Sequence, residues 1–560
     1  MKHSKMRARA VAVAVAAAAA LVLSACNAIP RSGPVQVGLD NLQQAEQPVQ
    51  FNAVGPSQGS SQEDVVRGFV LAAVSSSDDY ATAREFLSPD YAKQWDPNSD
   101  VLVDDGSRPY TTNKDGSGTL EVSASAKVDD TGLMLPVEPG ENTELRFELE
   151  RVGKEWRISS APNGIILDTT TFTTIWSPHQ LYFVGPGEIL VPETRWFMTR
   201  AALPTEIVGA LLEGPGARLS GVAHSGFPTG TALVTNAVPV VDGRARVDLT
   251  GNLLEASPTA MAEVRQQLRL SLQTVQNVNG FDLSVEGTLI RPGSGETASE
   301  PRLVNDVTDP AVLEGDKFGM IVAGEFVEME SFATTLGGYD PTAITLNPSG
   351  TAAAIRNAQG VTRIDDTGVV PIDERSGLLE PSYDVFNFIW TVQASSPQTL
   401  QVTSQDNTVT QLAAPWLAGR SLVALRLSPD GARVAALVRD EHGSQVLVAG
   451  VERDNDGVPV RTTDEADVQL WTSGTPVDLD WVGQTRFAVL SDASSTSRVT
   501  IGGVGLLSTE QGSVQGGVHL AGGAARSQLR VLGSKGDLYA SQGSGWQRTT
   551  TGVSVLAKRG

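Results

Sequence analysis

Few residue patterns in this 560-residue sequence have the spacing that catalysis or metal binding requires. Residues 55–59 (Gly-Pro-Ser-Gln-Gly) match the GxSxG pattern of a nucleophile elbow. A nucleophile elbow needs a strand before the serine, but the segment before this one is rich in Gln, Pro and Ser and has no strand pattern. Segment 452–457 starts like a calcium-binding loop, yet Thr463 occupies the position of the bidentate Glu. His224 and Ser225 are adjacent in a loop, where side chains seldom face each other. We therefore expect an acidic hairpin at 452–457, and we predict no enzyme activity, no cofactor and no metal site.

Cys26, the single cysteine of the chain, lies in a more specific pattern. Basic residues at 2–9 and an apolar run at 11–23 precede it, and this run is shorter than the roughly 20 residues of a membrane-spanning helix. The segment Leu23-Ser24-Ala25-Cys26 resembles a bacterial lipobox, which implies cleavage between Ala25 and Cys26, a diacylglyceryl group on the Cys26 thiol and palmitate among the attached fatty acids. We predict a signal peptide at 1–25 and a lipid anchor on Cys26 in the cell membrane, with the chain on the extracytoplasmic face. An ordinary signal peptide with a fortuitous cysteine is the alternative.

The charge of the chain excludes one class of partner. There are 42 Lys and Arg residues against 64 Asp and Glu residues, a formal net charge of −22. Affinity for nucleic acid comes from clustered Lys and Arg, so we expect no nucleic-acid partner. No segment after Cys26 approaches 18 consecutive apolar residues.

The segment 26–61 is rich in Pro, Gln, Gly and Ser, and we expect it to be a lipidated tether. The helices and strands that could position functional residues fall into three folded regions after it. In the first, 62–170, helical spacing at 65–73 is followed by strand patterns near 120–122, 144–150 and 156–158. Helices followed by antiparallel strands predict a small α+β domain, which resembles the NTF2-like domains of other envelope proteins.

The second region, 174–291, alternates strands and helices. We expect a hairpin of 181–183 with 190–192, a helix after Pro204, and a type I′ hairpin turn at Asp242-Gly243. Ser257-Pro258 begins a further helix, and a strand follows at 281–285.

Several motifs of this region resemble the GerMN domain of spore-germination proteins, which implies an α+β module for binding or assembly. Arg195 matches a recurrent arginine of that pattern, and we expect it to form a surface salt bridge. The motif segments are Leu212-Glu213-Gly214-Pro215, Phe227-Pro228-Thr229-Gly230-Thr231, Val241-Asp242-Gly243, Val247-Asp248-Leu249 and the helix with Gln266-Gln267.

The third region, 324–560, follows a linker at 292–323 and contains a repeat. Segment 345–354 aligns with 426–435, each a strand, a Pro-x-Gly turn and a strand. Turns are expected near 349, 391, 430, 484 and 535, a spacing of about 40–50 residues, which is the period of propeller blades. The sequence predicts an all-β C-terminal propeller of about five or six blades.

The order of these parts resembles the LpqB family of actinobacterial lipoproteins, as do the start Cys26-Asn27-Ala28-Ile29-Pro30 and the GerMN-like motifs. The resemblance implies a regulator that binds the extracellular domain of the sensor kinase MtrB. It thereby affects phosphorylation of MtrA, cell-envelope homeostasis and division. It supplies no catalytic residues, and the partner-binding residues are not defined by the sequence.

Two other functions stay open. A propeller-based envelope hydrolase would need ionisable groups that converge, and the sequence places no such group together. A ligand-binding lipoprotein usually has two α/β lobes, whereas the C-terminal half lacks helical periodicity.

Overall fold

The structure is a computed structural model that describes residues 53–291, 299–304, 311–322, 325–329, 335–336, 338–493 and 496–560. Ala25, Cys26 and most of the predicted tether lie outside the described residues. Within the described part, no helix is both long enough and apolar enough to cross a membrane.

The N-terminal domain is α+β, as predicted. Helix α2 (Gln62–Ala72) begins with a capping box, in which Ser61 and Asp64 satisfy each other's backbone N–H groups. Its buried face, which includes Phe69, packs with Trp95 and Phe147 in the core of the domain.

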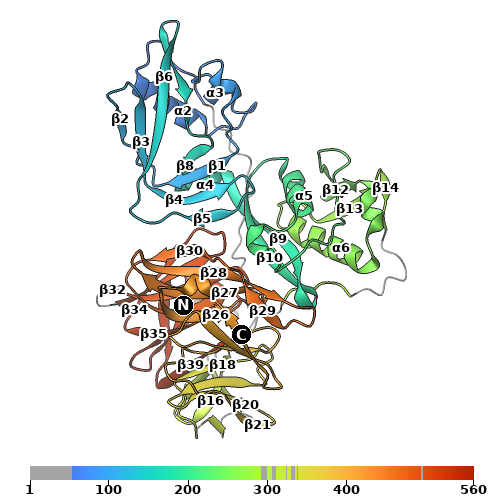
Figure 1. Ribbon diagram of the computed structural model, residues 1–560, viewed down its shortest axis with the longest axis vertical. Coiled ribbons are helices and arrows are strands. Elements are labelled where there is room, and N and C mark those ends of the chain that lie inside the picture. The colour runs from blue at the N-terminus through green and yellow to red at the C-terminus, as the bar shows by residue number, and fades with distance from the viewer. Residues whose placement is uncertain are drawn as a thin grey trace, which may run out of the picture. The chain divides into compact units, whose positions relative to one another are not determined.

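A short helix α3 (Ala81–Arg84) follows, and the strands of this domain form two four-stranded sheets (Figure 1). The first sheet has the order β5 (Met134–Pro136), β4 (Ala124–Asp129), β1 (Asp100–Asp104), β8 (Ile165–Asp168); the second has the order β2 (Tyr110–Thr112), β3 (Gly118–Val122), β6 (Thr143–Val152), β7 (Glu155–Ser160).

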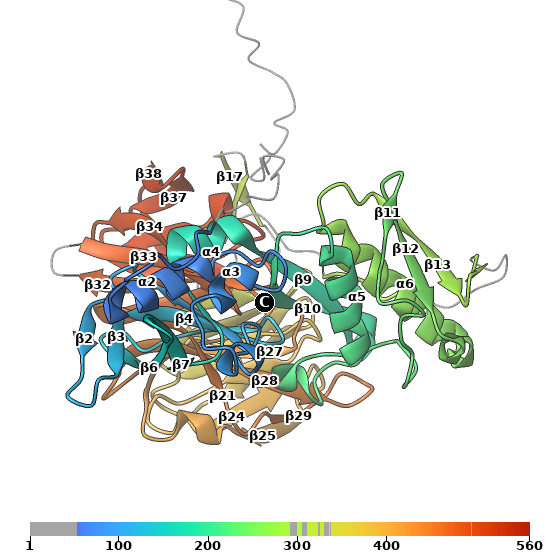
Figure 2. The same cartoon turned by 90° about the horizontal axis from the view of Figure 1, so that it is seen from above.

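The GerMN-like domain follows α4 (Thr169–Ile175) and starts with the antiparallel hairpin of β9 (Trp176–Gly185) and β10 (Ile189–Met198). Helix α5 (Leu203–Glu213) packs against α6 (Pro258–Gln273), beside the strands β12 (Arg244–Leu249) and β13 (Gly280–Val285) (Figure 2). β12 and β13 pair in parallel, so α6 is the crossover of a βαβ unit. The sheet is completed by β11 (Val240–Val241) and β14 (Thr288–Leu289) at its edges.

Two local predictions in this domain are confirmed. Asp242 and Gly243 both have positive φ, 53° and 73°, as the tight turn between β11 and β12 requires. Ser257 accepts a hydrogen bond from the Ala260 N–H and so caps α6, whose first residue is Pro258.

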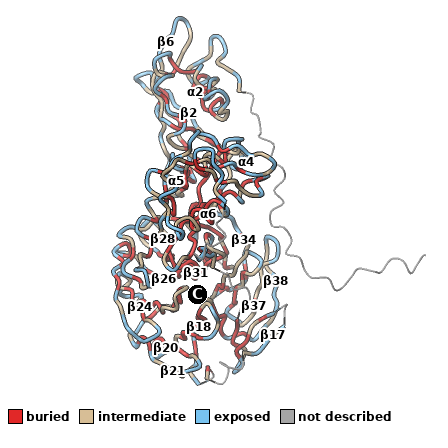
Figure 3. The backbone as a smooth tube through the Cα atoms, turned by 90° about the vertical axis from the view of Figure 1, so that its right-hand side faces the viewer, coloured by how far each residue is buried: buried red, intermediate tan, exposed pale blue. Residues whose placement is uncertain are grey.

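The C-terminal region forms six blades of β-sheet in the described residues, which confirms a propeller. The innermost strands are largely buried, as β31 is, whereas outer strands such as β38 are exposed (Figure 3). From the inner strand outward, the first two blades are β18 (Ala343–Leu346), β19 (Ala353–Asn357), β20 (Gly360–Asp365), β21 (Gly368–Asp373), and then β22 (Ser382–Tyr383), β23 (Ile389–Thr391), β24 (Thr399–Thr403), β25 (Val409–Ala413). The third blade is β26 (Ser421–Leu427), β27 (Arg433–Asp440), β28 (Gly443–Arg453), β30 (Asp467–Thr472), and β29 (Pro459–Thr462) also pairs with β28. The fourth blade is β31 (Thr475–Val482), β32 (Arg486–Ala493), β33 (Thr496–Gly503), β34 (Thr509–Val514), and the fifth is β35 (Gly517–Ala521), β36 (Arg530–Gly533), β37 (Leu538–Gln542), β38 (Gly545–Thr550).

The sixth blade joins the two ends of the propeller sequence. The C-terminal strand β39 (Val553–Arg559) pairs with β15 (Ala311–Glu314), which continues to β16 (Lys317–Val322) and β17 (Glu325–Glu328). Each innermost strand contacts that of the next blade, and β39 contacts both β35 and β18, so the ring is closed. Since β15 and β16 lie within 292–323, the described end of the predicted linker is part of the propeller, which begins before 324.

The expected turns agree with the structure in part. Those near 349, 430 and 484 join the first and second strands of their blades, as predicted. Position 391 is instead the end of β23, and 535 joins the second and third strands of its blade. In the second blade, the turn lies upstream, where the Asp384 carboxylate accepts hydrogen bonds from the N–H groups of Phe386 and Phe388. An Asx turn has replaced the Pro-x-Gly turn, so the repeat is degenerate there and the position of its turn was predicted too far downstream.

Candidate functional site: a buried ion cluster on the propeller axis

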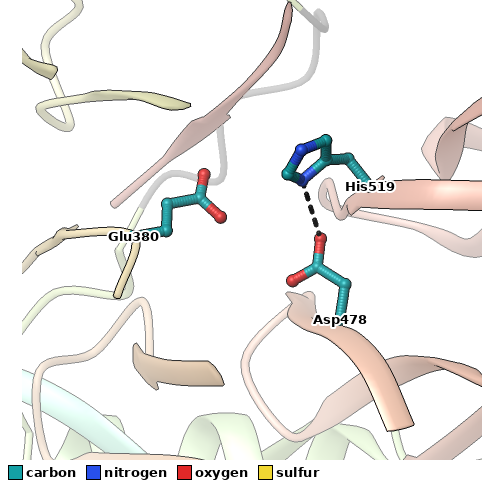
Figure 4. A group of neighbouring side chains, drawn as sticks. All are labelled: Glu380, Asp478 and His519. Atoms are coloured by element: carbon teal, nitrogen blue, oxygen red, sulfur yellow. Dashed lines mark ion pairs between the residues drawn. The ribbon is translucent and has the colours of Figure 1, made fainter. Parts of the chain in front are cut away.

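Ionisable side chains from several innermost strands meet at the centre of the propeller. Asp478 and Asp480 are on β31, Arg426 is on β26 and Lys558 is on β39. Glu380 lies two residues before β22, and His519 is on β35. Figure 4 shows Glu380 facing Asp478 and His519 from a different blade. Ring closure thus places residues from five blades in one cluster. We call these six residues the axial ion cluster.

Lys558 has two carboxylate partners in the axial ion cluster. Its Nζ lies 2.6 Å from Asp478 Oδ1 and 3.1 Å from Glu380 Oε2. The Arg426 guanidinium donates to the same Glu380 carboxylate, and its Nε lies 3.9 Å from Asp480 Oδ1. The two cations therefore bridge carboxylates that come from different blades.

Burial makes these charges interdependent. The side chains of Lys558 and Arg426 are 1% and 3% exposed, and those of Asp478 and Asp480 are 5% and 9% exposed. Burial alone would raise the pKa of Asp478, but the Lys558 ammonium, helped by His519 and Arg426, holds it well below its ordinary value. Burial raises the pKa of Asp480, and the charges of Lys558 and Arg426 oppose this rise only in part. Asp478 is therefore a firmly ionised carboxylate.

The arrangement argues against metal or acid–base chemistry at this point. Glu380, Asp478 and His519 each have a ligand atom within 4.8 Å of the others, which is a possible metal-binding spacing. However, the Lys558 ammonium already contacts both carboxylates, and a divalent ion would have to displace it. Asp478 also accepts hydrogen bonds from the N–H groups of Leu479 and Leu520. These contacts suit a structural clasp between blades.

Sequence reasoning missed the axial ion cluster. It expected no ionisable groups to converge in the propeller, yet the structure brings six together. One usable signal was available: Asp478 and Asp480 are charged residues inside the largely apolar strand β31. A charge in such a strand requires a buried partner.

A second buried ion pair lies in the GerMN-like domain and corrects a prediction. Arg195 was expected in a surface salt bridge, but Arg195 and Glu193 are 3% and 4% exposed and their side chains lie 2.8 Å apart. Arg195 also donates to the Gly214 carbonyl at 2.9 Å, and Glu193 accepts from the Gly216 N–H at 3.0 Å. The pair thus ties β10 to the turn that ends α5. This contact explains why charged residues occur in a strand that is buried throughout.

The remaining candidate residues do not form a site together. His224 Nε2 lies 3.4 Å from Glu263, whereas Ser225 Oγ donates to the Leu211 carbonyl, so the two neighbours do not act as a pair. The acidic segment 452–457 includes the turn between β28 and β29, where Asp454 accepts hydrogen bonds from backbone N–H groups. Residues 55–59 precede α2, with no strand before them in the described part.

Comparison with known proteins agrees with this architecture. The model described as the N-terminal domain of Lipoprotein LpqB matches residues 55–173, and the model of the Lipoprotein LpqB beta-propeller domain matches 333–556. Between them, the model described as "Sporulation and spore germination" matches 180–291. The fold and these matches define a three-domain protein, with an α+β domain, a GerMN-like domain and a propeller, that is similar to LpqB lipoproteins.

Individual relatives extend the likeness to nearly the whole chain. Lipoprotein LpqB of Cutibacterium acnes is 25% identical over 584 residues, which cover 96% of this chain and 97% of the relative. Lipoprotein LpqB of Mycobacterium bovis (strain BCG) is 26% identical over 491 residues, with 78% of this chain and 79% of the relative covered. The tandem GerMN domains of GerM from Bacillus subtilis are 22% identical, with 23% of this chain and 46% of that chain covered and a TM-score of 0.19. The resemblance to the LpqB lipoprotein family is confirmed.

Proposed function

We propose that this chain is a lipid-anchored protein on the extracytoplasmic face of the membrane that acts by binding. In this proposal it binds the extracellular domain of the sensor kinase MtrB and affects phosphorylation of MtrA, and so cell-envelope homeostasis and division. The observation that carries the proposal is the similarity to LpqB lipoproteins along 96% of the chain. Cys26 is the proposed lipid-attachment residue, and cleavage is proposed between Ala25 and Cys26.

The chemistry of the propeller supports binding over turnover. In the axial ion cluster, Glu380 and Asp478 are paired with Lys558 and Arg426, and Asp480 accepts hydrogen bonds from the N–H groups of Trp481 and Gly522, so these carboxylates are engaged in contacts within the propeller. A rigid closed ring instead offers a broad surface for a protein partner. We propose the GerMN-like domain as the first contact region for the kinase and the propeller as the second.

Physical linkage explains how such binding could regulate a kinase. A tethered protein searches a thin layer near its partner, which raises its effective concentration. It shifts the kinase between two states only if it binds one of them more tightly. Because the chain carries a net charge of −22, we expect the association rate to fall as salt increases.

Three measurements on the full chain test the proposal. The first is binding of the purified chain to the kinase extracellular domain over a salt series. The second is kinase autophosphorylation in vesicles that contain the lipidated chain, with Cys26→Ser as the matched variant that cannot accept the lipid. The third is metabolic labelling with a fatty-acid analogue. We expect binding in both forms, but a change in autophosphorylation only with the lipidated chain, and a fatty-acid label only on the unmutated chain.

Three results would contradict the proposal. Label on Cys26→Ser would remove the lipid-anchor assignment. Absence of binding at tens of micromolar, together with turnover of a glycan or ester, would favour the hydrolase instead; saturable binding of a small envelope compound without kinase binding would favour a ligand-binding lipoprotein.

A further inference from the structure

A positively charged pocket lies on the GerMN-like domain, between α6 and the strands β13 and β14. Its volume is about 340 Å³. Four arginines line it: Arg244 from the start of β12, Arg265 and Arg269 from α6, and Arg291 after β14. The residues at 265 and 269 are four apart, so both side chains lie on one face of the helix. A cluster of arginines is notable in a chain with a net charge of −22.

The two carboxylates of the pocket neutralise only part of this charge. Asp282 accepts a hydrogen bond from Arg244 Nε at 2.8 Å, so these two form a pair. Glu300 accepts from the Gln266 amide, and the Gln266 carbonyl oxygen in turn accepts from Arg269 Nε at 2.8 Å. Four guanidinium groups against two carboxylates leave the lining with two surplus positive charges.

Arg265 is the clearest sign that an anion belongs in the pocket. Its Nε and Nη2 atoms are shielded from solvent and have no hydrogen-bond partner among the described residues. A guanidinium is always charged in proteins, and a shielded charged donor without an acceptor is costly. An oxyanion in the pocket would supply that acceptor in the two-pronged geometry that guanidinium groups favour.

The rest of the lining indicates the class of anion. Phe281, Leu289 and Ile290 provide an apolar wall beside the arginines. Two surplus charges match a phosphate monoester, which carries about −1.5 to −2 at neutral pH, better than a single carboxylate. We propose that this pocket binds a phosphate monoester attached to an apolar group, with Arg265 and Arg269 on the phosphate. This inference is independent of kinase binding.

The test uses phenyl phosphate as a probe and the full chain with Cys26→Ser, so that no lipid anchor contributes. Calorimetric titration should show saturable binding of phenyl phosphate and no binding of phenol. Arg265→Gln and Arg269→Gln should each weaken the affinity about tenfold, the usual effect of losing a hydrogen bond to a charged group. Arg67→Gln, which removes an exposed arginine of α2, is the control for net charge and should bind as the parent chain does.

A stability measurement separates a binding role from a structural one. Since Arg265 has no partner among the described residues, Arg265→Gln should leave unfolding of the unliganded chain unchanged or shifted to higher temperature. Equal binding of phenol and phenyl phosphate, unchanged affinity of Arg265→Gln, or no binding of phenyl phosphate at millimolar concentration would each overturn the proposal.

Vesicles identify the source of the phosphate. Co-sedimentation with phosphatidylcholine vesicles that contain phosphatidic acid, lost in Arg265→Gln, would assign a lipid headgroup. Phenyl phosphate binding without co-sedimentation would assign a soluble or polymer-bound phosphate ester. Either result supports the pocket as a phosphate site.

Discussion

Replacement of Lys558 by Met tests whether the axial ion cluster stabilises the propeller. Methionine keeps most of the length of the lysine side chain but removes the ammonium that contacts Asp478 at 2.6 Å and Glu380 at 3.1 Å. Arg426 still contacts Glu380 after the change, so Asp478 is the carboxylate that loses its closest cation. Lys558→Met therefore leaves one buried charge without its main partner.

The expected loss of stability follows from this geometry. Removing one partner of a buried ion pair typically costs about 3–5 kcal/mol in the free energy of unfolding. Asp478 keeps backbone N–H donors from Leu479 and Leu520, both at 2.8 Å, which compensate in part. We therefore expect a value at the lower end, about 3 kcal/mol.

The pH dependence distinguishes a charge effect from a packing defect. In the unmutated chain the pKa of Asp478 is lowered, so its contribution is complete above the unfolded value of about 3.9 and is lost as the pH falls through the lower folded-state value. In Lys558→Met, burial then raises that pKa, and protonation relieves the penalty. The destabilisation should be largest at pH 7 and should shrink towards pH 4.

Amide hydrogen exchange of propeller peptides measures the free energy of unfolding of this domain separately from the others. Lys535→Met, at an exposed turn of the same propeller, is the matched control and should change stability by less than about 0.5 kcal/mol. If Lys558→Met costs less than about 1 kcal/mol at pH 7, or costs the same at pH 7 and pH 4, the cluster does not stabilise the ring as argued.

Two further predictions concern the GerMN-like domain. Arg195→Met should destabilise it by about 3 kcal/mol, because Glu193 remains buried without its cation and keeps only the Gly216 N–H as donor among the described residues. Arg200→Met removes a largely exposed arginine and should have little effect by hydrogen exchange. Burial lowers the pKa of His179 to about 4, so the folded state binds fewer protons than the unfolded state between that value and about 6.5. Stability should therefore fall by about 3 kcal/mol as the pH drops through this interval. His179→Gln should remove that pH dependence, and an unchanged slope in this variant would contradict the assignment.

Features that depend on neighbouring residues could be predicted from the sequence. The turn at Asp242-Gly243 and the start of α6 at Ser257-Pro258 were predicted at the correct positions, because backbone conformation and capping there depend on residues within one turn. The α+β, GerMN-like and propeller folds were also predictable, because helical spacing, motif segments and a repeated blade pattern are all present in the chain itself.

The tertiary structure decided which distant residues meet. Arg426 and Lys558 come from different blades, and their common partner Glu380 precedes a third, so only closure of the ring by β39 brings them together. Arg195 is buried because β10 passes beside the end of α5. The apolar residues around it in β10 indicate a buried strand, but its contact with the Gly214 carbonyl depends on how β10 packs against the turn after α5. A charge in a strand shows from sequence that a partner is needed, whereas the identity of the partner depends on packing between segments far apart in the chain.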